Sequence, residues 1–144
     1  MTKPETAVAL FREGFSCSQG VLAAFAADLG LDRETALKLA QPFGGGIARR
    51  ADWCGALTGA FLAVGLKHGR VRAEDAAARD RTYALVNELV RRFEAAHGAV
   101  RCRDLLGCDI GTPEGQRLAE DRKLHQTTCE RLVRDAAAML EEIL

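Results

Sequence analysis

The sequence has no excess of either charge, few aromatic side chains and no apolar run long enough to cross a membrane. Its 20 basic and 20 acidic residues cancel, so nothing favours nucleic acid or an anionic membrane as a partner. The uncharged stretch 53–66 is shorter than the roughly 20 residues of a membrane span, so no membrane insertion is expected. The N-terminus lacks a basic region followed by an apolar one, so we expect no signal peptide and a cytoplasmic location.

The five cysteines lack the local spacings of common redox and metal motifs. There is no Cys-x-x-Cys, which argues against a thioredoxin-type site or a zinc ribbon, and no Cys-x-x-Cys-His for haem attachment. Structural disulfides are rare in the cytoplasm, and an odd number of cysteines opposes a fully paired framework. The cysteines therefore point to redox chemistry or metal binding at a site that the fold must assemble from distant segments.

What the sequence does contain is a series of helical patterns, without the apolar–polar alternation of a strand. The apolar content of 48% in 144 residues supports one domain with its own core. The stretch 53–66 is apolar on all sides, and such a helix is normally buried. We therefore predict an all-α single domain over residues 1–144, a bundle of about six or seven helices around a central helix at 53–66.

Small residues follow one side of this central helix. Gly55, Gly59 and Ala63 are spaced by four, which places them on the same side and lets another backbone come close. We favour a contact within the chain over a homodimer. The glycine run 44–46, which precedes the helix, is interpreted as a turn rather than a phosphate-binding loop. Arg49 and Arg50 lie nearby, but no strand precedes the run and no Lys-Ser/Thr follows it.

Three cysteines follow a candidate N-cap residue and should lie in the first turn of a helix; the pairs are Ser16–Cys17, Asp52–Cys54 and Thr127–Cys129. Free backbone amides and the positive end of the helix dipole favour a thiolate there. The thiolate is the form that attacks disulfides and binds metals. Cys102 has another source of positive potential, since arginines flank it on both sides. If the cysteines were only buried packing residues, first turns would not be favoured.

Several motifs occur in the order found in a known family: Phe15-Ser16-Cys17-Ser18-Gln19, Phe43-Gly44-Gly45-Gly46, Cys54-Gly55-Ala56-Leu57-Thr58-Gly59, Cys102-Arg103-Asp104-Leu105-Leu106-Gly107, Thr112-Pro113-Glu114-Gly115 and Cys129. Together they resemble the proteins described as redox-active and labelled by the cysteine pattern C…GCAxxG…C…C. The resemblance covers nearly the whole chain. It implies that the signature cysteines are Cys17, Cys54, Cys102 and Cys129, with Cys108 an extra one. Trp53 stands where the label has glycine.

Three functions remain open. We favour a redox protein that transfers electrons with a protein partner and whose four signature cysteines bind an iron–sulfur cluster; a related domain in haem proteins of anaerobes supports this. The second is a metal-free thiol–disulfide protein, with Cys54 as the attacking thiol and Cys17 or Cys129 resolving. The third is a structural zinc site made of the same cysteines. His125 could tune or ligate such a site, although a surface role is favoured.

Overall fold

The protein is all-α, as predicted. The computed structural model describes all 144 residues and contains eight α-helices and no strand. They are α1 (Lys3–Arg12), α2 (Cys17–Ala26), α3 (Arg33–Ala40), α4 (Gly55–His68), α5 (Ala76–His97), α6 (Cys102–Leu106), α7 (Pro113–Asp121) and α8 (Glu130–Ile143). Short 3-10 turns follow α2 and α3, and a π-helical turn, His125–Cys129, leads directly into α8. None of these helices combines the length and apolar character that a membrane crossing requires.

The central helix is α4, which begins at Gly55 rather than at residue 53 and ends at His68. Its small residues allow α2 to pack closely against it. A Cβ atom on Gly59 would lie 2.6 Å from the carbonyl oxygen of Ser18, and one on Gly55 would lie 3.2 Å from the Cβ of Cys17. The small-residue side of α4 therefore serves a contact within the chain, and this contact brings Cys17 next to the start of α4.

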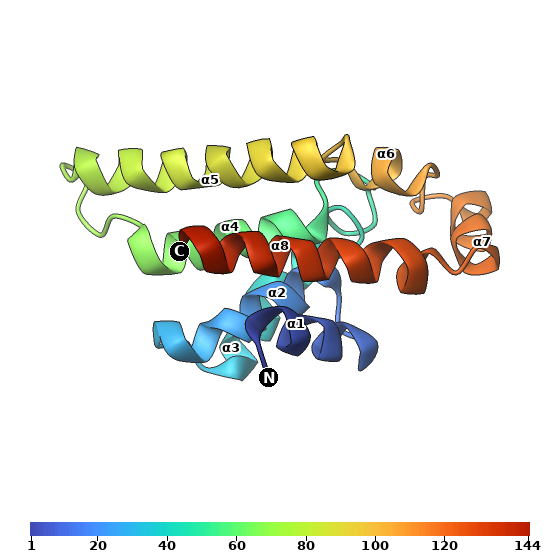
Figure 1. The fold of residues 1–144 in the computed structure, drawn as a ribbon, viewed down its shortest axis with the longest axis horizontal. Helices are drawn as coiled ribbons and strands as arrows, with labels where there is room; N and C mark the ends of the chain where they lie inside the picture. The colour runs from blue at the N-terminus through green and yellow to red at the C-terminus, as the bar shows by residue number, and fades with distance from the viewer.

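The main core is a cluster of 22 buried residues contributed by α1 to α5, α8 and Cys54. In Figure 1, α5, α4 and α8 run along the long axis of the molecule, while α1, α2 and α3 lie on the opposite side from α5. Leu89 and Phe93 of α5 are fully buried, whereas Tyr83 is 60% exposed, although helical spacing predicts all three on the inner face. The buried residues of α5 all lie in its C-terminal half, beyond Tyr83.

A second, smaller cluster lies at one end of the molecule, where α6 and α7 extend past α5 and α8 (Figure 1). Its five buried members are Ala51, Leu106, Ile110, Ala119 and Cys129. At the start of α7, the hydroxyl of Thr112 accepts a hydrogen bond from the amide of Gly115, and Pro113 is the first helical residue. This cluster borders the cysteines.

Of the three caps predicted beside cysteines, one is confirmed and two are wrong. Ser16 and Gln19 form a reciprocal capping box at the start of α2. Asp52 does not cap α4, because Cys54 itself is the N-cap residue and makes no side-chain cap bond. Thr127 does not cap α8 either, because the π-helical turn runs into α8 without a break, and the Thr127 hydroxyl donates to the carbonyl of Lys123.

Candidate functional site

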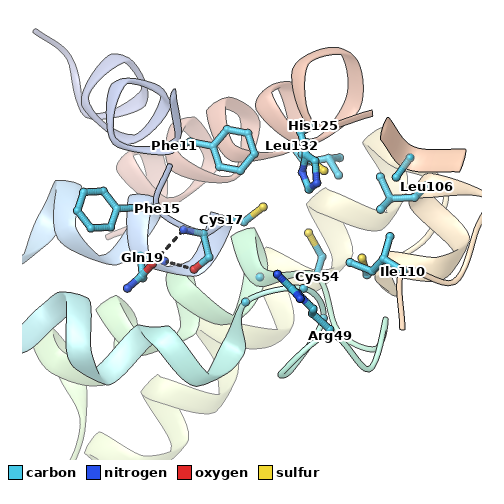
Figure 2. Close-up of a pocket in the computed structure, with 18 of the residues that line it drawn as sticks. Phe11, Phe15, Cys17, Gln19, Arg49, Cys54, Leu106, Ile110, His125 and Leu132 are labelled. Atoms are coloured by element: carbon cyan, nitrogen blue, oxygen red, sulfur yellow. Dashed lines mark hydrogen bonds between the residues drawn. The ribbon is translucent and has the colours of Figure 1, made fainter. Parts of the chain in front are cut away.

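The four signature cysteines line a single cleft of about 1030 Å³. They come from four segments: Cys17 is the first residue of α2, Cys54 precedes α4, Cys102 begins α6 and Cys129 immediately precedes α8. Figure 2 shows the sulfur atoms of Cys17 and Cys54 pointing into the same space, with His125 on the facing side. All five cysteines of the chain are free thiols in this structure.

Cys54 and Cys102 are brought together by a short backbone pairing between distant segments. Trp53 and Arg101 form an isolated antiparallel bridge. The amide of Cys54 donates to the carbonyl of Val100 at 2.9 Å, and the amide of Cys102 donates to that of Asp52 at 2.7 Å. The loop before α4 and the start of α6 are therefore held together at the two cysteines.

The guanidinium of Arg103 strengthens the same junction. It donates to the carbonyl oxygens of Ala51 at 3.1 Å and Arg50 at 3.0 Å, and the backbone amide of Arg103 also donates to Ala51. These bonds satisfy backbone groups of a loop that has no regular secondary structure. Arg103, which follows Cys102 in the sequence, thus holds the loop in place.

Cys17 and Cys129 form the most closely interacting pair of thiols. Cys17 packs against the small cluster that contains Cys129, and its thiol lowers the pKa of Cys129 to about 6, while Cys129 raises the pKa of Cys17 well above its usual value. Cys129 is only 6% exposed, and burial opposes its lowered pKa. Cys17 therefore keeps its proton, Cys129 loses its proton more easily, and the negative charge of the pair resides on Cys129.

His125 is the second group that stabilises the Cys129 thiolate. It lies four residues earlier, in the π-helical turn, and its imidazole interacts with the thiol. The same contact raises the pKa of His125. His125 is exposed, so the surface position that we favoured is correct, but its ring also lines the cleft (Figure 2). The spacing of four residues on a helical turn is the sequence signal for this contact.

The other two signature thiols are held in the protonated form. Burial raises the pKa of Cys54 to about 11, although the amides of Ala56 and Leu57 at the start of α4 act in the opposite direction. Burial and the neighbouring cysteines raise the pKa of Cys102 to about 12. First-turn amides act on Cys54 as expected, but loss of solvation outweighs their effect on its pKa. The role of Cys54 as the attacking thiol stays a prediction.

The side chains of the cleft do not form a ready metal-binding site. No group of three or more His, Cys, Asp or Glu side chains lies close enough together to hold a metal ion. The four cysteines share a cleft, but as they lie they do not form a ligand set for an iron–sulfur cluster or zinc. Cys108 is half-buried and packs against the small cluster without lining the cleft.

These features define a class: a helical protein with a solvent-accessible cleft in which thiols from distant segments meet. Residues 15–143 match the family model described as "Putative redox-active protein (C_GCAxxG_C_C)". The chain belongs to this family. Comparison with curated proteins and comparison with solved structures each gave no match.

Proposed function

We propose that the protein is a thiol–disulfide redox protein in which Cys17 and Cys129 cycle between a dithiol and a disulfide. The observation that carries this proposal is that Cys17 and Cys129 line one cleft beside His125 and pack at the same small cluster. A thiol–disulfide couple needs two sulfur atoms within reach of each other, an accessible nucleophile and a group that stabilises the thiolate. Cys17 and Cys129 pack at the same small cluster, Cys129 lines the open cleft although only 6% of it is exposed, and His125 stabilises its thiolate.

The chemistry follows from the two unequal thiols. The Cys129 thiolate attacks one sulfur of a substrate disulfide, RSSR, so that a Cys129–SR bond forms, the RS–SR bond breaks and one RS⁻ leaves. Cys17 then loses its proton and attacks the Cys129 sulfur, which forms the Cys17–Cys129 disulfide and releases the second RS⁻. The Cys17 proton ends on one RS⁻, the other RS⁻ takes a proton from water, and the substrate has gained the two electrons that the protein lost. A second dithiol, supplied by a redox partner protein, reverses the change.

The remaining signature thiols support this pair rather than compete with it. Cys54 is 4% exposed, and its raised pKa keeps it protonated at neutral pH. A protonated thiol is a weak nucleophile, so Cys54 and Cys102 should stay reduced while Cys17 and Cys129 react. We assign them a structural role at the junction of α4 and α6.

An iron–sulfur cluster or zinc ion is the second candidate, because the same four cysteines line one cleft. Four thiolates are the usual ligand set of such clusters and of closed zinc sites. This function requires the thiol groups to approach one another more closely than they do in this structure. The observed geometry therefore favours the dithiol.

Anaerobic purification followed by an absorption spectrum, metal analysis and a count of free thiols separates the candidates. The dithiol function predicts a colourless, metal-free protein that loses two thiols on mild oxidation and recovers both with a dithiol reductant. Stoichiometric iron with visible absorption, or stoichiometric zinc, would contradict it. Oxidation of the Cys108→Ser variant should also consume two thiols, because Cys108 does not line the cleft.

A further inference from the structure

Arg49 is a positive charge in the cleft that the proposed thiol exchange does not use. It lines the same cleft as the Cys17–Cys129 pair, and Figure 2 shows its side chain directed into the space between Cys17 and Cys54. No carboxylate oxygen lies within ion-pair distance of its guanidinium, and that guanidinium donates no hydrogen bond within the protein.

The other charged residues of the cleft do not neutralise Arg49. Arg12 and Glu130 pair with each other, and the guanidinium of Arg134 lies 3.7 Å from the same Oε1 atom of Glu130. Glu120 lines the cleft and interacts with His125 but makes no ion pair with Arg49. Arg49 and His125 thus both present positive potential toward the cleft.

The backbone at Arg49 adopts a conformation that needs support. Arg49 has a φ of 64°, and it ends a run in which residues 45–49 all have positive φ. Residues with a side chain rarely adopt this left-handed region, because it is strained unless the surroundings impose it. Here the amide of Arg49 donates to Gly44 at 3.1 Å, and the amide of Asp52 donates to Gly46 at 2.9 Å.

Two glycines make room for Arg49 in this position. A Cβ on Gly45 would lie 2.9 Å from the Cγ of Arg49, so the side chain folds back over a residue that has none. A Cβ on Gly111 would lie 2.7 Å from the Arg49 carbonyl oxygen, so the loop before α7 closes against its backbone. The left-handed turn and the two glycines together direct the guanidinium into the cleft.

We propose that Arg49 is the anion-binding group of the site, and that the substrate is a small disulfide with a carboxylate close to its sulfur atoms. This inference rests on the proposed thiol–disulfide function. The cleft is of the size that holds a small molecule. An arginine in such a cleft binds a carboxylate through charge-assisted hydrogen bonds and so fixes the disulfide beside Cys129. Arg49 is thus a positioning residue; the bonds broken and formed are those of the exchange described above.

The test compares three small disulfides that differ in charge: dithiodiglycolate is anionic, bis(2-hydroxyethyl) disulfide is neutral and cystamine is cationic. The second-order rate constant for oxidation of the reduced full-length protein is measured with each. Arg49→Gln should lower the constant for the anionic disulfide about tenfold, leave the neutral one within about twofold and raise the cationic one. Arg49→Lys should retain most of the anionic preference.

Arg50→Gln is the matched control, because Arg50 is the neighbouring exposed arginine and does not line the cleft. It should behave like the wild type with all three disulfides. Equal slowing of all three by Arg49→Gln would overturn the inference, as would an equal effect of Arg50→Gln. If the wild type forms the Cys17–Cys129 disulfide at rates independent of substrate charge, this inference fails alone. If the wild type forms no Cys17–Cys129 disulfide with any of the three substrates, the proposed function and this inference both fail.

Discussion

The two hydrophobic clusters of this molecule differ in size, in backbone conformation and in what they support. The main core has 22 buried residues from helices in ordinary right-handed geometry, while the cluster beneath α6 and α7 has five. The loop beside the smaller cluster contains four non-glycine residues with positive φ, at positions 47, 48, 49 and 51. The main core therefore provides most of the buried packing, while the smaller cluster lies beside the strained loop and the cleft. Such a division between a rigid scaffold and its functional site is common.

The difference shows how the cleft can hold strained backbone and ionised sulfur. Left-handed non-glycine residues and a buried thiolate are both unfavourable in isolation. Here the Trp53–Arg101 bridge and the guanidinium of Arg103 hold the strained loop against the start of α6. Gly55 lets Cys17 pack closely against the start of α4. The core thus fixes the ends of the segments that meet in the cleft.

The largest effect is expected from breaking the cleft pair itself. In Cys129→Ser, oxidation should no longer consume two thiols within one molecule, because the nucleophile and one half of the disulfide are gone. The free-thiol count and intact mass after mild oxidation check this. Cys54→Ala removes a thiol that should stay protonated, and it should retain the two-thiol change. Loss of that change in Cys54→Ala but not in Cys129→Ser would reverse our assignment.

The next effect tests the core. Gly59→Ala should lower the free energy of unfolding by about 2–3 kcal/mol, because its Cβ would meet the backbone of Ser18. Gly65→Ala is the control in the same helix: nothing lies within 4 Å of its Cβ position. That change should raise the free energy of unfolding by about 0.5–1 kcal/mol through helix propensity. Denaturant unfolding measures both; equal values for the two variants would contradict the close α2–α4 contact.

A smaller effect distinguishes the starts of α2 and α8. Ser16→Ala removes a hydroxyl that caps α2 and should cost about 1 kcal/mol. Thr127→Ala removes a hydroxyl that donates to Lys123 within a continuous helical segment, so we expect a change within about 0.5 kcal/mol. Thermal or denaturant unfolding of the two variants side by side is sufficient. A larger loss in Thr127→Ala would mean that α8 begins with a cap after all.

The smallest effect is a shift in pH dependence. Cys129 has a lowered pKa of about 6, so its rate of alkylation should rise as the pH increases through 6 and level off above it. Cys17, Cys54 and Cys102 face the same cleft as Cys129. Because His125 stabilises the Cys129 thiolate, His125→Asn should move the midpoint of the alkylation profile to higher pH. Peptide mapping of iodoacetamide labelling at Cys129 follows this. A midpoint that is unchanged in His125→Asn would exclude the imidazole contact.

The sequence predicted those parts of the fold that depend on neighbouring residues. The capping box at Ser16 and the buried central helix follow from patterns within a few turns. The failures at Asp52 and Thr127 have nonlocal causes. Asp52 lies in a loop that pairs with the segment before α6, and the π-helical turn extends α8 beyond the pattern that marked its start.

The sequence predicted which cysteines line the candidate site, but not which of them is ionised. The motif resemblance selected the four cysteines that line the cleft, yet their unequal proton affinities depend on burial and on the Cys17–Cys129 contact between α2 and α8. Arg49 could not be assigned from its neighbours, because its direction depends on a left-handed turn in residues with no preference for one. Such a turn is imposed by packing from other segments.

Disulfide mapping of the mildly oxidised protein tests the central claim most directly. Reduced protein is oxidised by one equivalent of a small disulfide, remaining thiols are blocked, and the linked peptides are identified by mass spectrometry. The account predicts a Cys17–Cys129 bond, with Cys54 and Cys102 recovered as blocked thiols. A bond that joins Cys54 to Cys102, or no bond among the four, would contradict it.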